Sequence, residues 1–304
     1  MIDRDCPTID VSVFLALGAA LSWTLAALVS HRPATELGSL HFNRVRMIAA
    51  TLIMGTILVI SGRPFDIPPI FFSSIILSAL AGVVLGDFFL FAALRRIGPR
   101  RSNILFASNA VFAALLGWVY LGEVIGLQAG LAILFGVGGV VLAVIYGKRR
   151  DLLHQWEDVT PPLWIGVVFG LMAAICQAFG VVFVRPVMAA GVDPVAVTLA
   201  RAAVGTIVFW ATFPFDPSRK GKPIFPRGRI LALTALNGLF GLGVGAAMLM
   251  AALEFGTVAT VTILSSTTPV MILPFIWMRT RRMPPPAAWI GAVFVVICTV
   301  LIAT

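Results

Sequence analysis

The sequence predicts an all-α membrane protein with ten transmembrane helices arranged as two inverted five-helix repeats. Three observations support this fold class: an apolar composition, ten apolar segments of spanning length, and a charge pattern that differs between the two halves. Hydrophobic residues make up 60% of the 304 residues, and charged residues only 12%. A soluble domain is roughly 45–50% apolar and about 25% charged, so this chain lacks the charges that a water-facing surface needs.

Each predicted span is an apolar run of about 20 residues, which is the length of helix that crosses a bilayer. Helices are expected because a helix satisfies its own backbone hydrogen bonds in lipid. The stretch after Asp10 is predicted to be the first span and not a removable signal, because the acidic N-terminus lacks the positive start of a signal peptide. The ten runs are 11–30, 40–60, 70–93, 102–121, 124–146, 162–185, 194–213, 229–253, 258–278 and 285–303.

An internal duplication is indicated by residues that recur in the same order in both halves of the chain. The segment 86–109 aligns without a gap with the segment 245–268, and five predicted spans fall in each half. Matches at a fixed separation are the sequence signature of a repeat. We therefore predict two domains, residues 1–150 and residues 151–304, each containing five helices.

Basic residues are concentrated in alternate links between the predicted spans. The opposite links contain only Arg63 and Arg185, and the N-terminus contains Arg4. Because lysines and arginines stay in the cytoplasm, this pattern predicts a cell (inner) membrane protein with both termini outside. The basic links are 1–2 (Arg32), 3–4 (Arg95, Arg96, Arg100, Arg101), 5–6 (Lys148, Arg149, Arg150), 7–8 (Arg219, Lys220, Lys222, Arg227, Arg229) and 9–10 (Arg279, Arg281, Arg282).

The basic end of corresponding helices changes between the two halves. Link 3–4 contains four arginines, whereas its counterpart, link 8–9, contains Glu254 and no basic residue. Link 4–5 contains Glu123, whereas its counterpart, link 9–10, contains three arginines. This exchange is expected when two related units have opposite orientations in the membrane, which is an architecture of transporters.

The net charge of +9 does not indicate nucleic-acid binding, because most basic residues lie in short links between spans. The three cysteines, Cys6, Cys176 and Cys298, fit no metal or redox spacing. The sequence contains no HExxH, GxSxG or phosphate-loop motif, so we predict no catalytic residues, no cofactor and no metal. An intramembrane enzyme and a channel or non-transporting scaffold are the alternatives to a transporter.

Asp87 is the only acidic residue well inside a predicted span. A charge at membrane depth is costly, and it marks a functional site by default. One interpretation is an ion pair with Arg46 or Arg44 of the second span. The other is a role in coupling to protons or substrate.

Arg201 is the counterpart of Arg46 in the second half, but Ala246 stands at the position that matches Asp87. Pairing with Glu254 or snorkelling toward the membrane surface would make Arg201 tolerable there. The alternative is an anion-attracting group beside a cavity.

Other polar residues inside the spans are candidates for a substrate pathway. Serine and threonine in membrane helices often bond to their own backbone or join helices, but two pairs occupy matched sites in the repeats. These pairs are Ser108 with Thr267 and Asn109 with Thr268. The full set of candidates is Trp23, Asp87, Ser108, Asn109, Gln177, Thr267 and Thr268.

Family-like motifs occur in both halves. They include "LSW" at 21–23, Arg46 with its counterpart Arg201, and the block 90–123, which ends in "LGE" and is followed by a glycine-rich fifth span. Together they resemble the EamA-type ten-helix carriers of the drug/metabolite transporter superfamily. The sequence departs from the family pattern at 278–284, "MRTRRMP", where a "GE" is expected. It also departs in its charge pattern, because family members commonly have both termini inside.

The resemblance implies a secondary transporter that exports or exchanges a small metabolite or amphipathic compound by alternating access, with proton coupling as an open alternative. It implies a central cavity lined by spans 1, 3, 4, 6, 8 and 9, with spans 5 and 10 as peripheral braces. The expected partners are a small-molecule substrate, in some cases protons, and the lipid bilayer, but no nucleic acid. The sequence leaves open whether the protein is a monomer or a homodimer.

Overall fold

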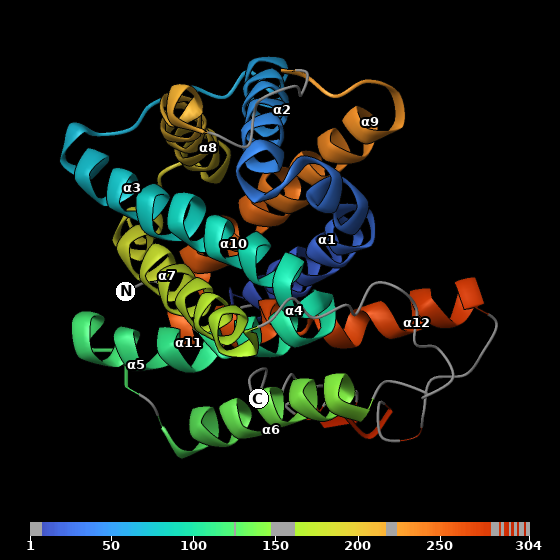
Figure 1. The fold of residues 1–304 in the computed structure, drawn as a ribbon. Coiled ribbons are helices and arrows are strands. Elements are labelled where there is room, and N and C mark those ends of the chain that lie inside the picture. Colours follow the sequence, from blue (N-terminus) through green and yellow to red (C-terminus); the bar gives the residue numbers. More distant parts are fainter. Residues whose placement is uncertain are drawn as a thin grey trace.

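The structure is a computed structural model that describes residues 8–124, 126–146, 162–216 and 224–280, with a few residues between 286 and 301. Every regular element in these residues is a helix. Figure 1 shows α2 and α8 side by side at one edge of the bundle and α6 at the opposite edge, with α1, α7 and α10 between them.

Helices of the first half are α1 (Thr8–Leu37), α2 (Ser39–Ile60), η1 (Pro69–Phe71), α3 (Phe72–Ser78), η2 (Ala79–Gly86), α4 (Asp87–Ala107), α5 (Asn109–Leu121) and α6 (Leu127–Tyr146). Those of the second half are α7 (Leu163–Ala189), α8 (Pro194–Ala211), η5 (Phe213–Phe215), α9 (Gly228–Asn237), η7 (Gly238–Gly245), α10 (Ala246–Phe255), α11 (Val258–Ser265) and α12 (Thr268–Thr280).

Six stretches of helix in the described part of the chain are long and apolar enough to cross a membrane. They correspond to predicted spans 1, 2, 3, 6, 7 and 8, and a shorter apolar helical stretch, Leu105–Leu121, covers the end of α4 and all of α5. The predicted tenth span, 285–303, lies largely outside the described residues, so the number ten stays a prediction. The six stretches are Val11–Ser30, Ser39–Ile60, Pro69–Ile97, Leu163–Ala189, Pro194–Phe215 and Gly228–Phe255.

The predicted link between the third and fourth spans, 94–101, does not interrupt the helix, so this boundary is wrong. The backbone of α4 is helical from Asp87 to Ala107 and runs through the arginine cluster. Arginine is among the better helix formers, so a basic segment can continue a helix beyond its apolar part. The Arg96 guanidinium lies over the ring of Phe169, 5.8 Å from its centroid. The side chains of Arg100 and Arg101 lie outside the described residues.

The predicted fourth and ninth spans are each divided into two helices, so the prediction of single helices there is wrong. The break lies at Ser108 in the first half and at Ser266 and Thr267 in the second. The Ser108 hydroxyl donates to the Leu105 carbonyl at 2.5 Å, and the Thr267 hydroxyl donates to the Leu264 carbonyl at 2.7 Å. Such hydroxyls compete with the backbone N–H groups for helix carbonyls, so matched residues end both helices in the same way.

A π-helical segment precedes the break in each half. The segment η2 leads into α4, and η7, also eight residues long, leads into α10. These segments correspond at the same separation as the repeat of 86–109 with 245–268, and each ends at the first residue of that repeat. Helices α1 and α7 pack against them crosswise, since α1 contacts η7 and α10 while α7 contacts η2 and α4. Each half therefore packs its first helix against the π-helical segment of the other half.

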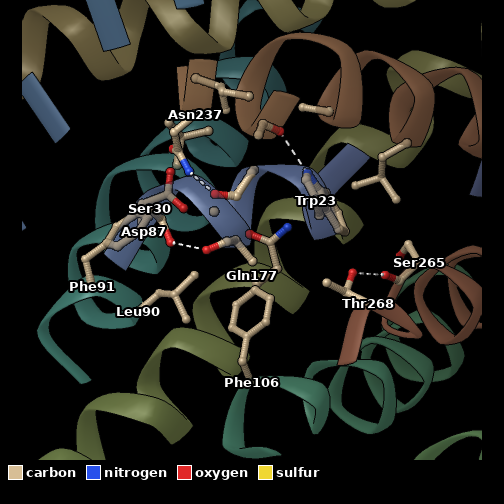
Figure 2. Close-up of a pocket in the computed structure, with 18 of the residues that line it drawn as sticks. Trp23, Ser30, Asp87, Leu90, Phe91, Phe106, Gln177, Asn237, Ser265 and Thr268 are labelled. Atoms are coloured by element: carbon tan, nitrogen blue, oxygen red, sulfur yellow. Dashed lines mark hydrogen bonds between the residues drawn. The ribbon is translucent and has the colours of Figure 1, made fainter. Parts of the chain in front are cut away.

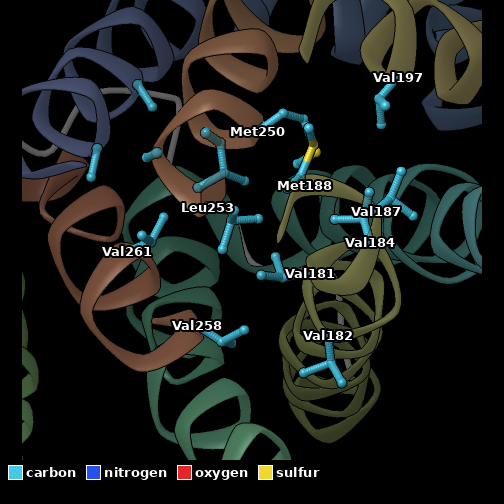
Figure 3. Packing of buried hydrophobic residues seen from close by; sticks show 14 of the residues in the cluster. Val181, Val182, Val184, Val187, Met188, Val197, Met250, Leu253, Val258 and Val261 are labelled. Atoms are coloured by element: carbon cyan, nitrogen blue, oxygen red, sulfur yellow. The ribbon is translucent and has the colours of Figure 1, made fainter. Parts of the chain in front are cut away.

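A cluster of buried apolar side chains fills one end of the bundle. It includes Val184 and Met188 in the C-terminal half of α7, Leu253 in α10 and Val258 in α11, as Figure 3 shows. Helix α1 contributes residues from its N-terminal half, such as Val13. This end of the molecule is therefore solidly packed.

Candidate functional site

A cavity of about 160 Å³ lies where the two halves of the chain meet. Figure 2 shows Trp23 from α1, Asp87 from α4, Gln177 from α7 and Asn237 from α9 around it. The resemblance implied spans 1, 3, 4, 6, 8 and 9 as the lining. The second and seventh spans also contribute, because Arg46 of α2 and Arg201 of α8 reach the cavity.

The cavity brings together four of the predicted pathway residues: Trp23, Asp87, Gln177 and Thr268. The other three, Ser108, Asn109 and Thr267, are not among the residues that line it. Their polar groups are used near the helix breaks. The Asn109 amide donates to the Phe106 carbonyl at 2.7 Å, and its oxygen accepts from the Ser266 hydroxyl at 3.4 Å. The two helix breaks are therefore in direct contact.

Asp87 forms an ion pair with Arg46. The Arg46 Nη2 and the Asp87 Oδ2 are 2.5 Å apart, and the exposed fractions of the two side chains are 5% and 17%. The Arg46 guanidinium also lies over the ring of Phe91, 5.0 Å from its centroid. A cation in this arrangement gains both a charge-assisted hydrogen bond and a cation–π contact. Of the two ion pairs proposed from the sequence, the structure contains the pair with Arg46.

Arg44 has a different partner, so the alternative pair between Asp87 and Arg44 is wrong. Its Nη1 lies 2.7 Å from the Asp216 Oδ2, and both side chains are buried. Its remaining donors bond to the Phe209 carbonyl at 3.0 Å and the Thr212 hydroxyl at 3.0 Å. Although Arg44 is only two residues from Arg46, two residues turn a helix by about 200°, so the two side chains face different neighbours. Asp216 was missed because the sequence places it in a polar link.

Arg201 is buried, with 3% of its surface exposed. Its Nη1 donates to the Met250 sulfur at 3.5 Å, and its Nε has no hydrogen-bond partner among the described residues. The described ion pairs do not include one between Arg201 and Glu254, so that predicted pair is not found. Its counterpart Arg46, by contrast, forms an ion pair with Asp87.

Trp23 and Asn237 bind helix α1 to the helices of the second half. The Trp23 indole N–H donates to the Gly241 carbonyl at 2.8 Å, and the Asn237 amide donates to the Ala26 carbonyl at 2.9 Å. A backbone carbonyl has two lone pairs, so the Gly241 carbonyl within η7 can accept from the Trp23 indole in addition to a helix hydrogen bond. Asn237 was not singled out from the sequence. A lone amide within an apolar run is the same signal that indicated Gln177, and it would have found Asn237 too.

No group of three or more histidine, cysteine, aspartate or glutamate residues in the described part of the chain is placed to hold a metal ion. The titratable residues that line the cavity are Arg46, Asp87 and Arg201. This composition suits the binding of a polar or charged organic molecule.

Comparison with known proteins identifies the family. The profile of the EamA-like transporter family matches residues 11–145 and again residues 164–304. The chain belongs to the EamA-like transporter family. It has two EamA domains, lies within the drug/metabolite transporter superfamily, and is a multi-pass membrane protein.

A solved structure supports the same fold. The chain is similar to one crystal structure whose description gives no function. The TM-score is 0.75 and the sequence identity 16%, over 96% of each chain. At this identity the similarity shows the fold alone. No curated protein sequence matches the chain.

Proposed function

We propose that the protein is a secondary transporter that exports a small organic compound by alternating access through the central cavity. The observation that carries this proposal is a cavity between the two EamA domains that both domains line with polar side chains, while one end of the bundle is tightly packed. Binding of substrate near the midplane between repeats is typical of secondary transporters.

The cavity and the packed end lie at different levels along the helices. In α1, Trp23 and Ser30 line the cavity, whereas Val13 belongs to the apolar cluster nearer the start of the helix. In α7, Gln177 lines the cavity, whereas Met188 belongs to the cluster nearer the end. The cluster therefore separates the cavity from one side of the membrane, as one state of an alternating-access cycle requires.

Polar contacts reinforce the packed end. Both carboxylate oxygens of Glu123 accept from the backbone N–H of Val258 at 3.0 Å, and the Arg185 Nε lies 3.9 Å from the same carboxylate. Arg63 pairs with Asp193 at 2.9 Å. All of these contacts join the first half of the chain to the second. We propose that they separate when the cavity opens to that side.

The proposed architecture is ten transmembrane helices in two inverted five-helix repeats, with the domain boundary at 150/151 and both termini outside. The matched π-helical segments and matched helix breaks support the duplication, and the placement of basic residues supports the inversion and the orientation. In this orientation the packed end faces outward. A reporter fused to Thr304 tests it, because reporter activity found only in the cytoplasm would overturn the orientation.

The proposed substrate pathway includes Trp23, Asp87, Gln177 and Thr268, with Ser108, Asn109 and Thr267 acting through the helix breaks. We propose that the pair of Asp87 with Arg46 is structural and that proton coupling, if present, is a second role of Asp87. Whether the protein works as a monomer or a homodimer does not affect this pathway, which lies within one chain.

Flux into vesicles containing the purified protein tests transport. We expect saturable uptake of one or more members of a metabolite library, measured with and without a pH gradient. Ala27→Trp fills the cavity, because Ala27 lines it, and should abolish uptake. Leu52→Trp is the matched control, since Leu52 is 66% exposed on the outer surface of α2, and it should leave uptake unchanged. Uptake that does not saturate would indicate a channel, and absence of uptake for every compound would argue against the transporter.

A further inference from the structure

We infer that Arg201 is the recognition site for the carboxylate of an organic anion, and that the cavity takes amphipathic monoanions. This inference names a substrate class for the proposed transporter, and its use in transport rests on that proposal. It begins with the unusual state of the Arg201 guanidinium.

The Arg201 side chain is buried but poorly satisfied. A guanidinium has five N–H donors and no acceptor. Among the described residues its one hydrogen-bond acceptor is the Met250 sulfur at 3.5 Å, and a thioether is a weak acceptor. The Nε is buried, and no residue in the described ranges accepts a hydrogen bond from it. Most of the donor capacity of Arg201 is therefore free for a molecule in the cavity.

The charge of the cavity lining is unbalanced. Its titratable side chains are Arg46, Asp87 and Arg201, so one carboxylate faces two guanidinium groups. Asp87 binds Arg46 directly at 2.5 Å. It also attracts Arg201 electrostatically, but the described ion pairs include none between these two residues. The lining therefore has one positive charge without a bonded counter-charge.

Arg201 and Gln177 both approach the cavity wall at a glycine, Gly82. A Cβ atom at Gly82 would lie 3.1 Å from the Arg201 Nη2 and 3.5 Å from the Gln177 Oε1. The same Cβ would lie 3.2 Å from the Gly180 Cα, so a side chain at this position would displace the guanidinium, and glycine lets Arg201 reach the cavity wall. Gln177 also points toward the cavity, as Figure 2 shows. A carboxylate at this point can accept from the guanidinium in the bidentate manner that arginine favours.

The remainder of the lining favours an apolar body on the bound anion. Apolar side chains of the lining, such as Trp23, Leu90, Phe106 and Leu249, lie in the same cavity as the charged groups. A small inorganic anion would leave these surfaces uncovered. An aromatic or aliphatic carboxylate would cover them and place its charge near Arg201.

Ala246 explains why the second domain cannot neutralise its own arginine. It aligns with Asp87 in the repeat, and both residues line the cavity. A charge buried without a counter-charge is costly in a membrane protein. A bound carboxylate supplies the missing counter-charge, so occupancy by an anion stabilises the protein.

The test uses the purified full-length protein with three probes of similar shape: benzoate, neutral benzamide and cationic benzylamine. Binding is measured by the shift in melting temperature and by quenching of tryptophan fluorescence. We expect benzoate to bind at least about tenfold more tightly than benzamide, as a charge-assisted contact to arginine predicts. Equal affinities for benzoate and benzamide would overturn the inference.

Ala246→Asp gives Arg201 an internal partner without removing the arginine. We expect this variant to remain folded and to lose the preference for benzoate, whereas Ala246→Asn, of similar size and without charge, keeps it. Retention of benzoate binding in Ala246→Asp would contradict the assignment to Arg201. Vesicle flux separates the two proposals: if no compound is transported, the transporter proposal fails, while the binding experiment still decides whether the cavity recognises anions.

Discussion

Arg46 and Arg201 occupy matched positions in the two EamA domains, but their surroundings differ. Arg46 has a carboxylate at 2.5 Å and an aromatic ring beneath its guanidinium. Arg201 is similarly buried, and its hydrogen-bond acceptor within the described part of the chain is a thioether at 3.5 Å. The difference arises from one matched position, where the first domain has Asp87 and the second has Ala246. It shows that the repeated architecture places a cation at the cavity twice and neutralises it within the chain only once.

Removing the acid from the first domain should have the largest effect. Asp87→Asn makes Arg46 resemble Arg201 and leaves two unpaired cations at the cavity. We expect a loss of about 3–5 kcal/mol in stability, which is the usual cost of breaking a buried ion pair from one side. The measurement is the melting temperature and the folded yield of the purified protein.

The double variant Asp87→Asn with Arg46→Gln is the control for this effect. If the pair is structural, neutralising both partners should recover much of the folded yield. If Asp87→Asn instead folds normally but loses gradient-driven uptake, Asp87 has the coupling role. Normal folding together with normal uptake would exclude both roles.

The crossings of α1 and α7 with the π-helical segments give a second comparison. At the crossing of α7 with η2, a Cβ atom added to Gly180 would lie 2.6 Å from the Gly82 Cα, which is too close. At the crossing of α1 with η7, a Cβ atom added to Gly241 would lie 3.6 Å from the Ala26 Cβ, which is an ordinary contact. Gly180→Ala should therefore push α7 away from η2 and cost about 1–3 kcal/mol, as overpacking generally does.

The matched control for the glycine variant is Gly55→Ala in α2. A Cβ at Gly55 would be 3.9 Å from the nearest atom, in Leu199, which is an ordinary contact. Thermal melting should show a clear decrease for Gly180→Ala and no decrease for Gly55→Ala. Equal melting temperatures for the two variants would show that the crossing of α7 and η2 tolerates a side chain.

The helix breaks should show the smallest effects. Ser108→Ala and Thr267→Val each remove one hydroxyl that bonds to a helix carbonyl. We expect each to cost about 0.5–1.5 kcal/mol, with the larger loss for Thr267, which is fully buried. If both variants melt as the wild type does, the hydroxyls do not stabilise the breaks.

Membrane class, family resemblance and the pairing of equivalent residues could be predicted from the sequence. Apolar runs of spanning length indicate a lipid environment, and residues that recur at a fixed separation show directly which positions are equivalent. The helix through the arginine cluster could not be predicted, because the run of basic residues suggested a link between two spans while the backbone preference of arginine favours a helix. The division of the fourth and ninth spans was also missed, since a serine or threonine within an apolar run is compatible with an unbroken helix.

The sequence alone determined that Asp87 needs a cation and that Arg201 has no acid at its matched position, because both follow from residue identities in an apolar chain. Only the tertiary structure decided between Arg44 and Arg46. That choice depends on which face of α2 meets α4 and which meets α8 and the short η5 that follows it, because Asp216, directly after η5, binds Arg44. It also placed Arg201 in the same cavity as the Asp87–Arg46 pair. The physical reason is that local patterns set the cost of burying a charge, whereas the packing of helices from both domains determines which partner meets it.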